Sequence, residues 1–157
     1  MKFVLTILCL ASLLTSCQLS DKNKETIMNT AYNENLAKSV NADDYGMKKY
    51  VMAFLKAGPN RDQSQEEAIA LQKAHMDNIS RLAEEGKLIV AGPFLDDGEL
   101  RGIYIFDVED IESARALTES DPAIQAGSLV MELKPWYGSA SLMLVKDYHD
   151  KLKKKDF

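Results

Sequence analysis

The chain has 157 residues, which is enough for one domain plus appendages. It carries 24 acidic and 19 basic side chains, a formal net charge of −5 at pH 7. A modestly acidic surface argues against nucleic acid as a partner, because phosphate backbones are bound by basic patches.

Residues 1–16 have the pattern of a bacterial signal peptide. Lys2 is followed by an apolar run over residues 3–14, which is too short to span a bilayer as a folded helix. Residues 14–17, Leu-Thr-Ser-Cys, resemble the lipobox of bacterial lipoproteins, in which small residues precede a cysteine. By that resemblance Cys17 is acylated and becomes the mature N-terminus. We therefore expect a lipid-anchored protein of the cell envelope, facing the periplasm or the outside.

The alternative is an ordinary signal peptide with a chance cysteine. In either case cleavage would remove Cys9, the only other cysteine in the chain. The mature chain would then have no disulfide, no cysteine for a metal site and no thiol nucleophile.

Residues 17–46 are polar, and no dense apolar face runs through them. We predict a lipidated N-terminus followed by a flexible tether. The asparagines of this stretch are Asn23, Asn29, Asn33, Asn35 and Asn41.

A strand and a long helix begin the predicted domain. Residues 50–55 form a nearly continuous apolar run, which is typical of a strand buried in a sheet. Ser64 and Glu67 have the spacing of a capping box, and Gly86 suits the position just after a helix. These signals predict a helix over residues 65–85.

One histidine lies within the apolar stripe of this helix. At spacings of four, four and three the stripe holds Leu71, His75, Ile79 and Leu82. Ala68 extends the stripe by one turn. His75 is then either a packed imidazole satisfied by a nearby carbonyl, or a general acid or base at the floor of a cleft.

Two more strands follow the helix. The first covers residues 88–91 and is interrupted by Gly92 and Pro93, because proline cannot donate to a strand ladder. The second covers residues 100–108.

A second helix begins at its cap Asp110, and its buried side holds Ile111, Ala114 and Leu117. Asp121 caps one further turn over residues 122–126.

The last strand covers residues 129–133 and is closed by Pro135. Residues 143–157 form a lysine-rich tail, which we interpret as a solvated helix. A patch that binds a membrane surface is the alternative.

The order β-α-β-β-α-β over residues 47–142 predicts a ferredoxin-like α+β fold. Two βαβ halves then form a four-stranded antiparallel sheet with both helices on one face. The other face of the sheet is left uncovered and apolar. Because such a face marks an interaction surface, we expect a homodimer with the sheets packed together.

Several short motifs, in this order along the chain, resemble the YCII-related domain family. The resemblance covers about residues 47–142. It rests on the run at 50–55, Ala91-Gly92-Pro93-Phe94, Asp97-Gly98, Asp121-Pro122-Ala123, Gln125-Ala126-Gly127 and Lys134-Pro135-Trp136-Tyr137.

The resemblance implies a dimeric ferredoxin-like α+β domain with a histidine–aspartate pair at its active site. Here that pair is His75 from the first helix and Asp121 from the Asp-Pro motif. The lipobox, the tether and the lysine-rich tail lie outside the family pattern.

A histidine–aspartate dyad can move a proton on a small organic substrate, by isomerisation or by elimination of a leaving group. Phe94, Tyr104 and Trp136 are candidates for an aromatic pocket, and each also suits the core or a dimer interface. No residue cluster predicts a metal or another cofactor. The alternatives to a proton-transfer enzyme are a non-catalytic module that binds a small ligand or a protein, and a purely structural dimer.

Overall fold

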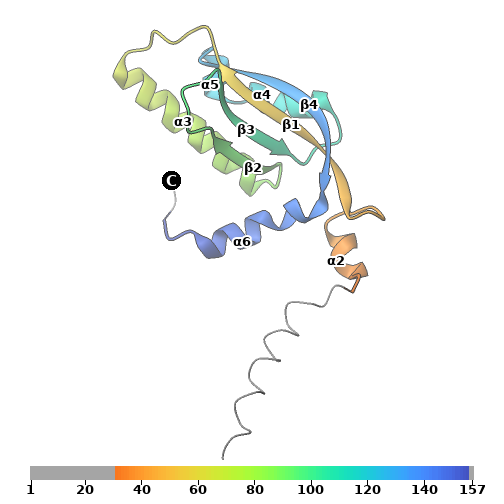
Figure 1. Ribbon diagram of the computed structural model, residues 1–157. Coiled ribbons are helices and arrows are strands. Elements are labelled where there is room, and N and C mark those ends of the chain that lie inside the picture. The colour runs from red at the N-terminus through yellow and green to blue at the C-terminus, as the bar shows by residue number, and fades with distance from the viewer. Residues whose placement is uncertain (1–30, 156–157) are drawn as a thin grey trace, which may run out of the picture. The chain divides into compact units, whose positions relative to one another are not determined.

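The computed structural model describes residues 31–155, so the expected signal peptide, Cys17 and residues 17–30 of the expected tether lie outside the described residues. Figure 1 labels the elements. In chain order they are α2 (Glu34–Ser39), β1 (Met47–Ala57), α3 (Gln65–Glu84), β2 (Leu88–Pro93), β3 (Leu100–Phe106), α4 (Ile111–Glu119), α5 (Pro122–Gln125), β4 (Leu129–Ser139), the 3₁₀ helix η1 (Ala140–Leu144) and α6 (Val145–Leu152).

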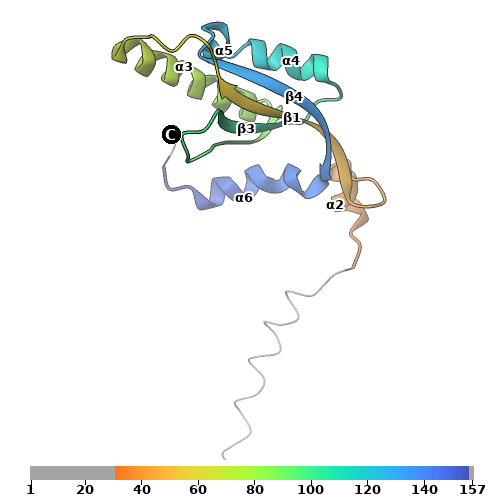
Figure 2. The same ribbon diagram turned by 45° about the horizontal axis from the view of Figure 1, so that its top comes forward.

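The four strands form one antiparallel sheet in the order β2-β3-β1-β4. This is the order produced by two interleaved βαβ halves, so the predicted ferredoxin-like α+β fold is confirmed. Helices α3 and α4 lie on the same side of the sheet (Figure 2).

Alternation along β1 explains how the core forms. Val51, Ala53 and Leu55 are buried, while Met52 and Phe54 between them are only half-buried. The buried set packs under the helices, and the core cluster comprises Val51, Ala53, Leu55, Leu82, Leu88, Tyr104, Phe106 and Ala114.

Helix α3 begins and ends at the signals that the sequence contains. The Glu67 N–H donates to Ser64 Oγ over 3.3 Å, and the Ser64 N–H donates to the Glu67 carboxylate over 2.8 Å. Gly86 has φ +68°, a conformation that glycine adopts without strain, and the Lys87 N–H then bonds the Leu82 carbonyl at 2.9 Å.

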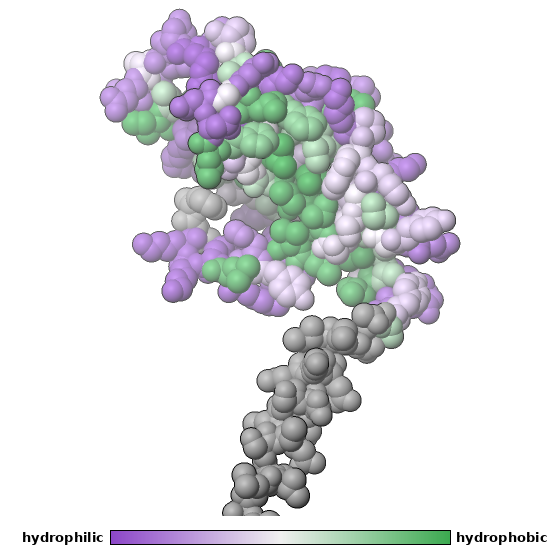
Figure 3. All heavy atoms as spheres, viewed as in Figure 1, coloured by the Kyte–Doolittle hydropathy of each residue, from purple (hydrophilic) through white to green (hydrophobic). Residues whose placement is uncertain are grey.

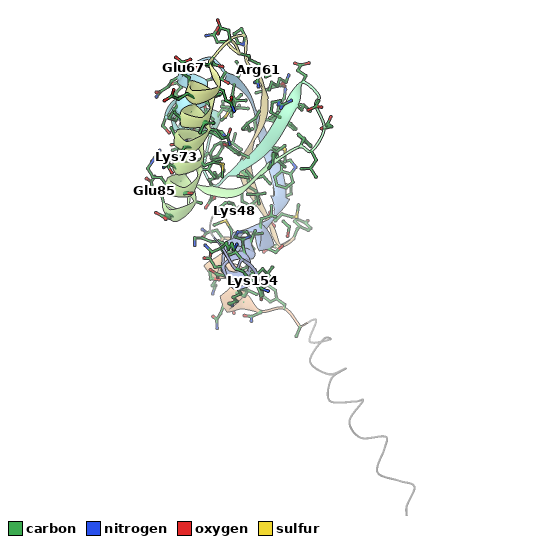
Figure 4. All side chains as sticks on the ribbon, turned by 90° about the vertical axis from the view of Figure 1, so that its left-hand side faces the viewer. Lys48, Arg61, Glu67, Lys73, Glu85 and Lys154 are labelled. Carbon is green, nitrogen blue, oxygen red and sulfur yellow. The ribbon has the colours of Figure 1, made fainter. Side chains whose placement is uncertain are left out.

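The predicted apolar stripe of α3 is shorter than expected. Leu71 is half-buried and His75 and Leu82 are buried, but Ala68 is exposed. The first turns of α3 extend past the strands in Figures 1 and 2, so they have no sheet to pack against. In Figure 4 the labelled Glu67, Lys73 and Glu85 point outward from the same helix.

Strand β4 does not stop at Pro135, and that part of the prediction is wrong. The strand continues to Ser139, and Pro135 pairs with Val51 in the ladder with β1. Proline is tolerated there because β4 is an edge strand, so a backbone N–H on its outer side has no neighbouring strand to bond.

The second face of the sheet is not left fully uncovered. Here η1 and α6 lie on the side opposite to α3 and α4 (Figure 2). Tyr50 and Ile105, which point to this side, are 2% and 5% exposed, and the Tyr50 hydroxyl donates to the Ser139 carbonyl at 3.1 Å. Met52, Phe54 and Ile103 stay half-buried, and Figure 3 views this face with its apolar side chains gathered along the sheet.

Residues 34–46 belong to the compact unit that begins at Glu34, although we expected them to be part of the tether. Val40 is buried at 7% exposure. Asp43 organises the turn before β1, because its carboxylate accepts hydrogen bonds from the Tyr45 and Met47 N–H groups and from the Tyr137 hydroxyl. Within residues 31–155, no helix has the length and apolar character to cross a membrane.

Candidate functional site

His75 and Asp121 meet in the layer between α3 and α5. The imidazole Nδ1 lies 2.8 Å from Asp121 Oδ2 and 3.0 Å from Oδ1. His75 is 8% exposed and Asp121 is fully buried. A buried carboxylate requires partners for its charge, and the imidazole N–H supplies one.

Asp121 is held in place by the backbone around it. It is the N-cap of α5, and its Oδ1 accepts the Ala123 N–H at 2.9 Å. Its own N–H donates to the Thr118 carbonyl at the end of α4, at 3.0 Å. Pro122 occupies the first turn of α5, where its fixed φ suits a helix start and its missing N–H costs nothing. The cap role predicted for Asp121 therefore coexists with its bond to His75.

Tyr104 completes the group from β3. It faces the helices, opposite Ala53 in the ladder, and its hydroxyl lies 3.3 Å from His75 Nε2. The two rings are stacked, with centroids 6.4 Å apart. Burial, and secondarily the negative charge of Asp121, raise the pKa of Tyr104 well above its usual range.

These contacts assign a tautomer to the neutral imidazole. A phenol that stays protonated donates its hydrogen to Nε2, so Nε2 carries the lone pair. Nδ1 then carries the hydrogen and donates it to Asp121. Tyr104, His75 and Asp121 therefore form a buried series of hydrogen bonds, in which the phenol donates to Nε2 and Nδ1 donates to the carboxylate.

A second polar group beside the dyad was not predicted from the sequence. Asn78 is 7% exposed, and its Oδ1 accepts a hydrogen bond from Arg81 Nη2 at 2.8 Å. The same guanidinium nitrogen donates to Ser120 Oγ at 3.1 Å, so Arg81 and Asn78 connect α3 to the residue before Asp121. Asn78 follows His75 by three positions on the same helix, and that spacing was the available signal.

The three aromatic candidates do not form one pocket. Tyr104 contacts His75, as just described. Trp136 pairs with Tyr50 across the strands, and the two rings are tilted by 35° with centroids 5.8 Å apart, on the sheet face opposite to Tyr104. Phe94 lies in the connection after β2 and is 43% exposed.

An open hollow of about 960 Å³ lies elsewhere on the domain, at the turn before β1 and the start of that strand. Its walls include Asn41, Asp43, Lys48, Lys87, Asp107 and Tyr137. His75, Tyr104 and Asp121 do not line it. Lys48 and Asp107 form an ion pair in it at 2.8 Å. Within residues 31–155 no group of three or more His, Cys, Asp and Glu side chains is arranged to hold a metal ion.

Comparison with known protein families identifies the family of this chain. The model of the YCII-related domain matches residues 52–137. The chain belongs to the YCII-related domain family. His75, Tyr104 and Asp121 all lie inside the matched segment, whereas α2, η1 and α6 lie outside it. The predicted family is confirmed.

Two individual proteins are similar to the chain. Uncharacterized protein YjpA of Bacillus subtilis (strain 168) is 31% identical over 62 residues, which cover 40% of this chain and 71% of that protein. Among solved structures, 5-chloro-2-hydroxyhydroquinone dehydrochlorinase (TftG) from Burkholderia phenoliruptrix AC1100, in complex with 2,5-dihydroxybenzoquinone, aligns with a TM-score of 0.42 and 21% identity. That alignment covers 55% of this chain and 92% of that one.

Proposed function

We propose that this protein is a proton-transfer enzyme of isomerase or lyase type, acting on a small organic substrate through His75 and Asp121. The observation that carries the proposal is the pair itself, a carboxylate 2.8 Å from imidazole Nδ1 with both groups buried. A carboxylate in that position fixes the tautomer and stabilises the imidazolium that forms when Nε2 takes a proton.

In the proposed step, the substrate displaces the Tyr104 hydroxyl from Nε2. The imidazole then takes a proton from the substrate and returns it either to another atom of the same molecule or to a departing group. Because the pKa of Tyr104 is raised, the phenol stays protonated and acts as a hydrogen-bond donor toward a substrate oxygen on which negative charge develops. Its 3.3 Å contact with Nε2 is long for an O–H···N bond, which favours its replacement by a ligand.

The test is solvent deuterium exchange, followed by proton NMR, on a panel of small carbon acids. We expect the protein to accelerate exchange for at least one member of the panel. General acid–base catalysis contributes about 10²–10⁴-fold, so His75→Gln should reduce the rate by at least about 100-fold. Tyr104→Phe, which keeps the ring and removes the hydroxyl, should lower the rate less. Equal rates for the His75→Gln variant and the native protein would contradict the proposal.

A second candidate function is a non-catalytic module that binds a small ligand. It is favoured by the low exposure of the dyad together with the open hollow at the turn before β1. Under this reading, a ligand bound by the protein perturbs the NMR signals of Lys48 and Tyr137 rather than those of His75. The same panel therefore separates the two functions.

We also propose that Cys17 is lipidated and that the domain works at the cell envelope as a homodimer. The lipobox pattern supports the anchor, and the half-buried Met52, Phe54 and Ile103 on the second sheet face support the dimer.

A further inference from the structure

Helix α6 has an apolar stripe that stays largely exposed, although the helix contacts η1 and the edge strand β2. Val145, Tyr148 and Leu152 follow one another at helical spacing, and they are 38%, 62% and 80% exposed. No residue of α6 is buried. A helix whose apolar residues become more exposed toward its end has a surface that is available to a partner.

The charge of this segment is opposite to that of the rest of the chain. Residues 145–155 hold five lysines and two aspartates, a net charge of +3, on a chain whose formal net charge is −5. Asp150 pairs with Lys146 at 2.7 Å and with Lys153 at 3.0 Å. Beyond these pairs the segment contributes Lys151, Lys154 and Lys155, all of them exposed.

The lysines lie next to the apolar stripe. Lys151 Nζ stands 5.2 Å from the centre of the Tyr148 ring, and Lys154, labelled in Figure 4, follows Leu152 by two residues just after the helix. An apolar stripe flanked by lysines and carrying a tyrosine is the composition of a helix that lies in the interface of an anionic bilayer.

The position of α6 in the fold also favours a membrane as its partner. In Figure 2, α6 lies on the side of the sheet opposite to α3 and α4, and α2 lies at the N-terminal end of β1 near the start of α6. The compact unit begins at α2, and the Gly46 carbonyl just before β1 accepts the Ala140 N–H of η1 at 2.9 Å, so the chain enters the domain next to the segment that leads into α6. An anchor joined to that end of the domain would bring α6, rather than α3, toward the lipid.

We propose that α6 and the lysines after it dock on the surface of an anionic lipid bilayer and fix the orientation of the domain there. The inference rests on the proposed lipid anchor and is independent of the proposed catalysis. Val145, Tyr148 and Leu152 enter the interface, while Lys151, Lys154 and Lys155 contact acidic headgroups.

The experiment uses the full, lipidated chain in vesicles of phosphatidylcholine with about a third phosphatidylglycerol, an anionic lipid whose surface charge attracts basic segments. A fluorophore is attached at Leu152→Cys and, as the control, at Ile69→Cys on α3, which is 64% exposed. Spin-labelled lipid should quench the first label and spare the second. The quenching should disappear in pure phosphatidylcholine vesicles and at high salt.

Replacing Lys151, Lys154 and Lys155 with glutamine should reduce the docked-to-undocked ratio on the order of 100-fold, since each lysine near an anionic surface contributes about 1 kcal/mol. Replacing Lys49, Lys73 and Arg115 with glutamine changes the net charge equally and should leave the ratio nearly unchanged, because these exposed side chains lie on the helix side of the sheet.

Equal losses in the two triple variants would overturn the proposal, because the attraction would then depend on net charge alone. Absence of quenching at position 152 would overturn it as well. If the label at position 152 is shielded equally in all lipids and in detergent, the partner of α6 is a second copy of the chain and the membrane proposal is wrong.

Discussion

Replacing Asp121 with alanine should lower the free energy of unfolding by about 3 kcal/mol. Two losses add up to this magnitude. The Ala123 N–H loses its cap acceptor, and an N-cap is worth about 1 kcal/mol. The His75 N–H loses its acceptor in a buried site, and an unsatisfied buried donor costs about 1–3 kcal/mol.

The matched control is Asp110→Ala. Asp110 caps α4 by accepting the Ser113 N–H at 2.7 Å, but it is exposed and has no histidine partner. This variant should lose about 1 kcal/mol. Urea unfolding followed by circular dichroism measures both variants. Equal losses would refute the reasoning, because the bond between Asp121 and His75 would then contribute nothing beyond the cap.

A double-mutant cycle isolates the pair. His75→Ala should cost about 2 kcal/mol less in the Asp121→Ala chain than in the native chain, since residues in one hydrogen-bonded network are not additive. Additive losses would show that the contact at 2.8 Å between His75 and Asp121 contributes no coupling energy to folding.

Three further predictions concern the anchor, the assembly and Tyr104. Cys17→Ser should move the protein out of the membrane fraction of cells, and an unchanged distribution would place the anchor elsewhere. Light scattering should give a dimer at micromolar concentration, and Phe54→Glu, on the second sheet face, should give a monomer; a native monomer would defeat the sheet-to-sheet arrangement. Because the pKa of Tyr104 is raised in the folded state, the unfolded chain releases this proton near pH 10 while the folded chain keeps it, so the free energy of unfolding should fall as pH rises above about 10. Tyr104→Phe should make that decline shallower in urea titrations, and an identical slope would show that Tyr104 does not titrate differently on folding.

Local signals predicted most of the fold. The capping box at Ser64 and Glu67, the glycine at position 86 and the caps at Asp110 and Asp121 each act within one turn of the chain, and the structure contains all of them. The strand order follows from the β-α-β-β-α-β sequence, because the connections leave few topologies open.

The errors concern effects that depend on tertiary position. Pro135 stops a central strand but not an edge strand, and the sequence alone does not say that β4 lies at an edge. Ala68 fits the apolar stripe, but the sheet does not extend under the first turns of α3. On the second face Tyr50 is buried, contacts Trp136 and bonds the Ser139 carbonyl, and the mixed residues that follow β4 do not predict that η1 and α6 return to this face.

The candidate site was partly predictable. The family resemblance paired His75 with Asp121, and the geometry of the pair agrees with it. Strand alternation alone would have separated Trp136 from Tyr104, since Trp136 pairs with Tyr50 while Tyr104 pairs with Ala53, three residues further along β1. The contacts of Arg81 with Asn78 and Ser120 depend on how α3 meets the end of α4, which no local pattern encodes.

The most direct test of the proposed chemistry is ¹⁵N NMR of the His75 imidazole at neutral pH. The account predicts a protonated Nδ1 and an unprotonated Nε2, because Asp121 accepts from the first nitrogen and Tyr104 donates to the second. In Asp121→Asn, whose amide can donate to Nδ1, the hydrogen should move to Nε2. A native protein with the hydrogen already on Nε2 would contradict the account, because the free lone pair would then lie on Nδ1 against Asp121 and Nε2 could not take a proton from a substrate.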